Sequence, residues 1–190
     1  MRRTMRAAGL LAAILGAGTI ADAADPFQVD PVHSSVLFRV KHMQASFAYG
    51  RFNQVTGRFL VDEADPSRSS FDLTIAGESI DTANAIRDRH LKGPDFFNTK
   101  QFPTITFKSR SVARAGDGYD VTGDLMLHGV TRPVTLRLAE TGSGKGMRGE
   151  SLAGVEATFE LKRSDFGMTY MVGPIGDEVR VTAALEGNRK

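Results

Sequence analysis

Cysteine is absent from the 190 residues of this chain. Its absence excludes disulfide bonds, a thiol nucleophile, cysteine-ligated zinc and iron–sulfur clusters. The fold must therefore be held by its apolar core and its backbone hydrogen bonds alone. Hydrophobic residues make up 41% of the chain and charged residues 24%, a composition typical of a folded globular domain rather than of a disordered chain.

An excess of one charge sign is also absent once the N-terminal segment is set aside. Arg2, Arg3 and Arg6 precede a charge-free run over residues 7–20, and small residues follow at 21–23. This pattern predicts a signal peptide over residues 1–23, a domain over residues 24–190, and a periplasmic or secreted location. The apolar run of 14 residues is shorter than the ~20 of a spanning helix, so we expect no stable membrane anchor. Residues 24–190 carry 21 basic and 21 acidic side chains, which argues against nucleic acid as a partner.

The remaining chain is dominated by alternation of apolar and polar residues, the pattern of half-buried β-strands. Short connections rich in Gly, Asp, Asn and Pro separate the alternating segments, which favours antiparallel neighbours. A closed up-and-down barrel and a two-sheet sandwich both fit, and the even strand lengths favour the barrel. The eight predicted strands are residues 34–42, 51–61, 71–79, 104–112, 119–128, 133–140, 155–163 and 178–186.

One segment interrupts the alternation and predicts a single short helix over residues 82–92. Asp81 or Thr82 is the expected N-cap, and Gly93 followed by Pro94 ends the helix. Two adjacent aromatic residues follow at 96–97, so we expect this excursion to cover one open end of the barrel. Residues 141–149 are expected to form a polar hairpin loop.

Motifs for catalysis or metal binding are also lacking. The tripeptide at 165–167 matches the magnesium-binding DFG of protein kinases, but no phosphate-covering loop or catalytic loop accompanies it. His33, His42, His90 and His128 lie in separate segments without the spacing of a local metal motif. No nucleophile elbow frames a serine. We therefore expect no catalytic residue, no metal and no cofactor.

Several short phrases occur in a fixed order along the chain: VDPVHSSV (29–36), FRVKH (38–42), GRF (50–52), DRHLKGPDFF (88–97), FPTITF (102–107), GDLMLHGVTRPV (123–134) and RSDFGM (163–168). Together they resemble the YceI-like family of exported polyisoprenoid-binding proteins. The resemblance runs from about residue 27 to about residue 185, and it departs mildly at Gly93, where serine is common in the family. It implies a lipocalin-like eight-stranded antiparallel barrel that holds a long-chain isoprenoid, and it supplies no catalytic residue.

In such a barrel, the inward-facing residues and the apolar residues of the cover are the predicted ligand contacts. A polar head group is expected to meet Arg51, Asp88, His90 or His128. The predicted ligand-binding residues are Phe38, Val40, Phe59, Leu73, Ile75, Ile86, His90, Leu91, Phe96, Phe97, Ile105, Phe107, Leu125, Leu127, Phe159, Phe166 and Met168.

The expected function is that of an exported carrier or storage protein for a long-chain polyisoprenoid, or for a quinone-like lipid with a prenyl tail. Two other functions remain open at this point. An enzyme acting on a lipid or an amide would place a polar cluster with perturbed pKa values in the same cavity. A solid-cored stress or interaction protein would have no cavity. A homodimer is also compatible with the pattern.

Overall fold

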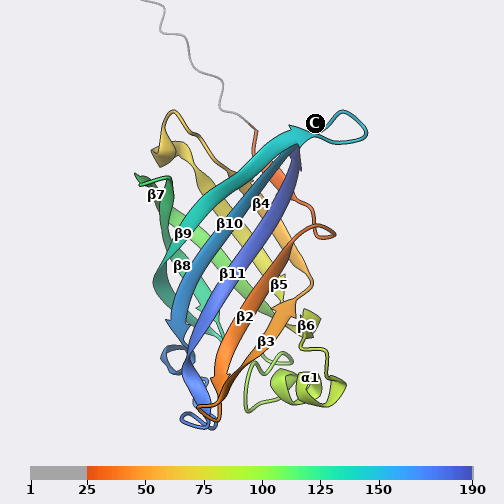
Figure 1. Cartoon of the computed structure of the whole chain (residues 1–190), viewed down its shortest axis with the longest axis vertical. Coiled ribbons are helices and arrows are strands. Elements are labelled where there is room, and N and C mark those ends of the chain that lie inside the picture. Colours follow the sequence, from red (N-terminus) through yellow and green to blue (C-terminus); the bar gives the residue numbers. More distant parts are fainter. Residues whose placement is uncertain (1–24, 190) are drawn as a thin grey trace, which may run out of the picture.

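The computed structural model describes residues 25–189, so the predicted signal peptide over residues 1–23 lies outside the described residues. One sheet of eleven strands curls into a tall closed barrel with a single α-helix at one end (Figure 1). The α-helix α1 spans Ala85–Lys92, and 3-10 turns occupy Pro66–Arg68, Gly77–Ser79 and Arg163–Phe166. The strands are β1 (Phe27–Val29), β2 (Ser35–His42), β3 (Ser46–Phe52), β4 (Val55–Leu60), β5 (Ser70–Ala76), β6 (Ile80–Asp81), β7 (Thr104–Ala115), β8 (Gly118–Leu127), β9 (Val130–Lys145), β10 (Ser151–Lys162) and β11 (Ile175–Arg189).

Three pairs of short strands act as single interrupted strands of the barrel. β1 and β2 follow one another along the same edge of β11, while only two residues separate β3 from β4, and a 3-10 turn separates β5 from β6. Counted in this way, eight strands surround the core. Strand β1 pairs with both β4 and β11 and so closes the ring. The predicted eight-stranded antiparallel barrel with one covering helix is confirmed, and this closure rules out the two-sheet sandwich.

Several strands differ from their predicted extents, and β3 and β9 each gain five residues at one end. Residues 46–50 form most of β3, which was not predicted as a strand, because its aromatic residues point outward and its small residues inward. Strand β9 continues to Lys145, so the predicted loop over residues 141–149 is reduced to residues 146–150. The last residues of β9 do not alternate between apolar and polar side chains, but their backbone pairs with β10 from Gly142↔Gly154 to Lys145↔Ser151. Backbone pairing, together with a hydrogen bond from Lys145 Nζ to Ser151 Oγ, therefore maintains this exposed end of the strand.

The helix begins three residues later than predicted. Asn84 is the N-cap, and its side chain accepts hydrogen bonds from the backbone N–H groups of Ile86 and Arg87. Asp81 cannot serve because it belongs to β6 and pairs with β3. Thr82 is buried, and its hydroxyl donates to the Asp88 carboxylate at 2.5 Å. No helix among residues 25–189 is both long and apolar enough to cross a lipid bilayer.

The end of the barrel away from α1 is filled by aromatic side chains. The ring of Phe59 stacks between Phe27 and Phe71, with centroid separations of 5.7 and 6.0 Å. Tyr119 is also buried near this end, and its hydroxyl donates to the Glu140 carboxylate at 2.9 Å. Stacked aromatic rings at such separations pack closely and bury a large apolar area. The space inside the barrel therefore lies between this stack and α1.

An apolar cavity as the candidate functional site

A cavity of about 560 Å³ occupies the interior of the barrel between the aromatic stack and α1. This volume lies within the range of ~300–1,000 Å³ found for ligand pockets. Side chains of Val, Leu, Ile, Phe, Ala and Met form most of its wall, and none of the described residues that line it is Asp or Glu. A wall of this kind favours an apolar guest over water. A solid-cored barrel is therefore contradicted.

Most of the residues predicted to contact a ligand lie on this cavity. They come from five strands, from α1, from the turn after α1 and from the loop between β10 and β11. Contact with a ligand itself stays a prediction. The predicted residues on the cavity wall are Phe38, Val40, Leu73, Ile75, His90, Leu91, Phe96, Phe97, Ile105, Phe107, Leu125, Leu127, Phe159 and Met168.

Three predicted contacts lie away from the cavity wall. Phe59 faces inward but belongs to the aromatic stack at the closed end. Phe166 is buried in the 3-10 turn that follows β10, outside the cavity. Ile86 is 73% exposed on the outer face of α1. Ile86 and Leu91 stand about 140° apart around a helix, so only one of them can face the barrel.

The sequence reasoning also missed several residues of the wall. Strand β3 contributes Ala48 and Phe52, and the end of the barrel contributes Met171 and Ile175. Continued alternation through residues 46–52 is the signal that identifies the first pair. The loop that holds Met171 has no periodic pattern, so no sequence signal identifies it. Strand β11 adds Val179, Val181, Ala183 and Leu185, whose alternation was recognised but not assigned to the ligand.

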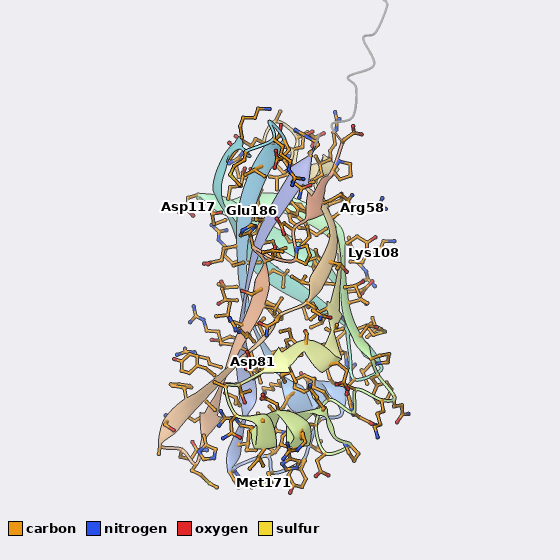
Figure 2. The ribbon with its side chains drawn as sticks, turned by 90° about the vertical axis from the view of Figure 1, so that its right-hand side faces the viewer. Arg58, Asp81, Lys108, Asp117, Met171 and Glu186 are labelled. Atoms are coloured by element: carbon orange, nitrogen blue, oxygen red, sulfur yellow. The ribbon has the colours of Figure 1, made fainter. Side chains whose placement is uncertain are left out.

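The cavity opens between β3 and the segment that contains α1. Strand β3 pairs with β6 only at Arg51 and Phe52, so the edge below these residues has no partner strand among the described residues. On the other side of the opening, the rings of His90, Phe96 and Tyr170 pack edge to face at 5.0 to 5.7 Å. Figure 2 shows Met171 at the extreme end of the molecule, beyond α1 and far from Glu186. This opening is called the mouth below.

Polar side chains on the wall are few. Arg87, on α1, donates from Nε to the Thr82 hydroxyl at 2.8 Å and from Nη2 to the Thr82 carbonyl at 2.7 Å. His90 lies 3.0 Å from the Asp95 carboxylate, which is outside the cavity. Arg87 with Thr82 is the only hydrogen bond between two wall side chains in the described part of the chain. Among the described residues, the side chains of the wall therefore include no hydrogen-bonded pair of nucleophile and base.

Arg163 is the most deeply buried charged side chain in the cavity wall, at 4% exposed. Its guanidinium donates to three backbone carbonyls, those of Gly176, Met168 and Ile175, at 2.8 to 3.1 Å. Burial lowers the pKa of Arg163, while the nearby Asp177 carboxylate opposes this effect. An arginine keeps its charge even so. Arg163 thus fixes the loop that carries Met168 and Met171 at the mouth.

Three of the four residues predicted to meet a head group are held elsewhere. Arg51 pairs with Asp81 at 3.2 Å on the outer face, and Asp88 accepts hydrogen bonds from Thr82. His128 lies beneath the wall, with Nδ1 3.1 Å from the Phe166 carbonyl and a buried Nε2 that has no partner. Only His90, of these four, lies on the cavity.

A second group of polar residues gathers at the opposite end of the barrel. His33 Nδ1 lies 2.9 Å from Asp30 Oδ2 and 3.6 Å from Glu186 Oε1. The hydrogen bond with Asp30 raises the pKa of His33, and the same contact lowers the pKa of Asp30. The Ser34 hydroxyl bonds to both the N–H and the carbonyl of Glu186. The group therefore joins the break between β1 and β2 to strand β11.

The sequence matches a known family and its relatives along nearly the whole chain. Residues 27–187 match the family model described as the YceI-like domain. A "UPF0312 protein" of Pseudomonas aeruginosa is 39% identical over 190 residues, covering 100% of both chains. A "UPF0312 protein" of Yersinia pestis is 38% identical over 187 residues, covering 98% of this chain and 97% of the other.

Solved structures share the barrel. BcnA of Burkholderia cenocepacia superposes with a TM-score of 0.76 at 26% identity, over 84% of this chain and 99% of BcnA. The YCEI protein of Campylobacter jejuni gives 0.70 at 29% identity, over 79% and 90% of the two chains. A domain of Saccharophagus degradans described as polyisoprenoid binding gives 0.64 at 17% identity, over 86% and 98%, a likeness of fold alone.

Proposed function

The chain belongs to the YceI-like family, and we propose that it binds a long-chain isoprenoid or a similar prenyl-tailed lipid inside its barrel and carries or stores it. The observation that supports this proposal most is the cavity, which has an apolar wall, one closed end and one mouth. A slim, flexible hydrocarbon chain fits this shape, with its tail toward the aromatic stack. The polyisoprenoid-binding domain of Saccharophagus degradans shares only the fold with this chain, so the proposal rests on the cavity and not on that likeness.

The energetics of burial support tight binding. Each buried CH₂ group contributes roughly 0.8 kcal/mol, so one five-carbon prenyl unit contributes ~4 kcal/mol before ordering costs. Several units therefore give tight binding even after those costs are subtracted, within the practical ceiling of ~18–21 kcal/mol for noncovalent affinity. The wall needs no dense polar cluster for this purpose. A role in binding rather than catalysis accounts for the small number of polar groups on it.

We propose further that the polar end of the lipid lies at the mouth, beside Arg87 and His90. These two side chains and His42 are the ionisable groups of the wall that lie near α1 and the β2–β3 turn. A quinone ring and a hydroxyl or phosphate group can each accept hydrogen bonds from such donors. The signal-peptide pattern over residues 1–23 supports an exported protein, acting in the periplasm or outside the cell.

The test is native mass spectrometry of the exported protein purified from its own organism, followed by extraction and identification of any released molecule. A stoichiometric prenyl lipid supports the proposal and identifies the ligand. An unliganded mass that does not change after incubation with polyprenols and prenyl quinones contradicts it.

A further inference from the structure

The outer face of the β2–β3 hairpin combines cationic and apolar side chains in an unusual way. On each of three cross-strand pairs a basic residue lies opposite an apolar or aromatic one, as Arg39 lies opposite Tyr49 and Lys41 opposite Phe47. The Arg39 guanidinium and the Lys41 ammonium lie 4.5 and 4.7 Å from the centre of the Phe47 ring. The set, called the hairpin face below, is Leu37, Arg39, Lys41, Phe47, Tyr49 and Arg51.

The charge of this region has one sign. Residues 35–52 contain three basic side chains, Arg39, Lys41 and Arg51, and no Asp or Glu. Arg51 pairs with Asp81, whereas Arg39 and Lys41 form no ion pair within the described residues. The neighbouring surface of β10 and β11 is mixed. Glu160, Asp177 and Glu178 line one groove with Lys162 and Arg180, and Arg39 and Lys41 of the hairpin border the same groove. The positive excess therefore belongs to the hairpin itself.

Exposed apolar side chains continue from the hairpin face to the mouth of the cavity. Phe47 is 45% and Tyr49 62% exposed, and both also line the cavity. Two hydrogen bonds, from the Met43 N–H to the Pro174 carbonyl and from Gln44 Nε2 to the Gly173 carbonyl, fix the hairpin tip to the β10–β11 loop. That loop exposes Met171 at the end of the molecule (Figure 2). Apolar exposure of this extent around an opening marks an interaction site.

We propose that the hairpin face and the tip of the β10–β11 loop dock on an anionic lipid bilayer. Aromatic residues prefer the headgroup level of a bilayer, and lysine and arginine reach anionic headgroups while their aliphatic stems cover apolar surface. The absence of carboxylates from the hairpin fits a negatively charged surface rather than a neutral one. Docking in this orientation sets the mouth against the bilayer, so that an apolar chain enters or leaves the cavity without crossing water. This inference rests on the proposed function, because it identifies where the lipid is exchanged.

The experiment is flotation of the mature protein with vesicles of phosphatidylcholine alone or of phosphatidylcholine mixed with phosphatidylglycerol. We expect binding to the anionic vesicles and its loss as salt is raised. The variant R39Q/K41Q is expected to bind these vesicles about 30-fold more weakly, since each cation near an anionic surface contributes about fivefold. Neither side chain lines the cavity, so this variant is expected to retain polyprenol in native mass spectrometry.

A matched control lies at the opposite end of the barrel. Arg58 and Arg148 are exposed, and R58Q/R148Q removes the same charge from the opposite end (Figure 2 labels Arg58). For the apolar part, F47S is paired with M147S, a change at an exposed methionine in the β9–β10 loop. The proposal is supported if only R39Q/K41Q and F47S lose vesicle binding.

Equal binding to both vesicle types, equal loss in the control variants, or no binding at all would overturn the proposal. Polyprenol binding in native mass spectrometry distinguishes failure of the docking proposal from failure of the proposed function. A protein that binds polyprenol in solution but does not bind anionic vesicles contradicts docking alone.

Discussion

The ring of Phe38 lies directly over Gly50, its cross-strand partner, on the inner face of the hairpin. A Cβ atom at position 50 would overlap Phe38 Cζ and would lie 2.8 Å from Thr82 Cγ2. The absent side chain thus lets an aromatic ring cross β3 toward the segment that anchors α1. We expect Gly50→Ala to destabilise the protein by about 1–3 kcal/mol, the typical range for overpacking. Urea unfolding measures this difference.

Gly144 provides the control for this prediction. It also lies in a strand, but no atom lies within 4 Å of a Cβ built there. Gly144→Ala is therefore expected to leave the unfolding free energy unchanged or slightly raised, because alanine reduces the entropy of the unfolded chain. If both variants lose the same stability, the contact between Phe38 and Gly50 is not the cause.

A second prediction concerns the cavity and uses two neighbouring alanines of β11. Ala183 lies on the cavity wall, while Ala184 points to the other face of the strand. Ala183→Phe fills part of the space that a lipid would occupy, so we expect its affinity for a polyprenol to fall tenfold or more, about 1.4 kcal/mol. Ala184→Phe adds the same side chain outside and is expected to bind normally. Titration with a fluorescent polyprenol measures both affinities.

The ring of eight strands was predictable because most strands keep one apolar face along their whole length. The alternation of Val179, Val181, Ala183 and Leu185, for example, is visible in the sequence and is seen on the cavity wall. Strand β3 was not predicted because its larger residues point outward. Phe47 and Tyr49 lie outside while Ala48 and Gly50 lie inside, which inverts the usual relation between size and burial.

Alternation determines the face of a strand but not the depth of a residue along the barrel. Phe59 and Phe71 are direct partners on adjacent strands and both face inward, yet only Phe71 borders the cavity. Phe59 does not border the cavity because it lies inside the aromatic stack, which the ring of Phe27 completes on the closed side. Phe27 comes from a three-residue strand that has too few residues for a periodic pattern. The position of the closed end therefore could not be derived from the sequence.

Arg163 gives a third prediction, about the loop at the mouth. Arg163→Met keeps much of the side-chain volume but leaves three carbonyl acceptors without their donors. Each buried acceptor without a partner costs ~1–3 kcal/mol, so we expect a large loss of stability with faster hydrogen exchange in residues 168–176. Arg163→Lys retains the charge and one or two of the bonds, and it should recover part of the loss. Exchange spread evenly over the barrel would contradict a local role for Arg163.

The last prediction concerns pH and the contact between Asp30 and His33. The pKa of His33 is raised in the folded protein, so its contribution to stability is fully present below its ordinary pKa of 6.5 and is lost as pH rises through the folded value. The pKa of Asp30 is lowered, so its contribution is present above 3.8 and is lost as pH falls through the folded value. The pair therefore stabilises the fold most between these two limits. We expect the difference in melting temperature between the wild type and His33→Gln to be largest near pH 5 to 6 and to vanish in alkaline buffer, as measured by thermal unfolding monitored by circular dichroism. A difference that stays constant with pH would show that His33 acts through packing and not through its charge.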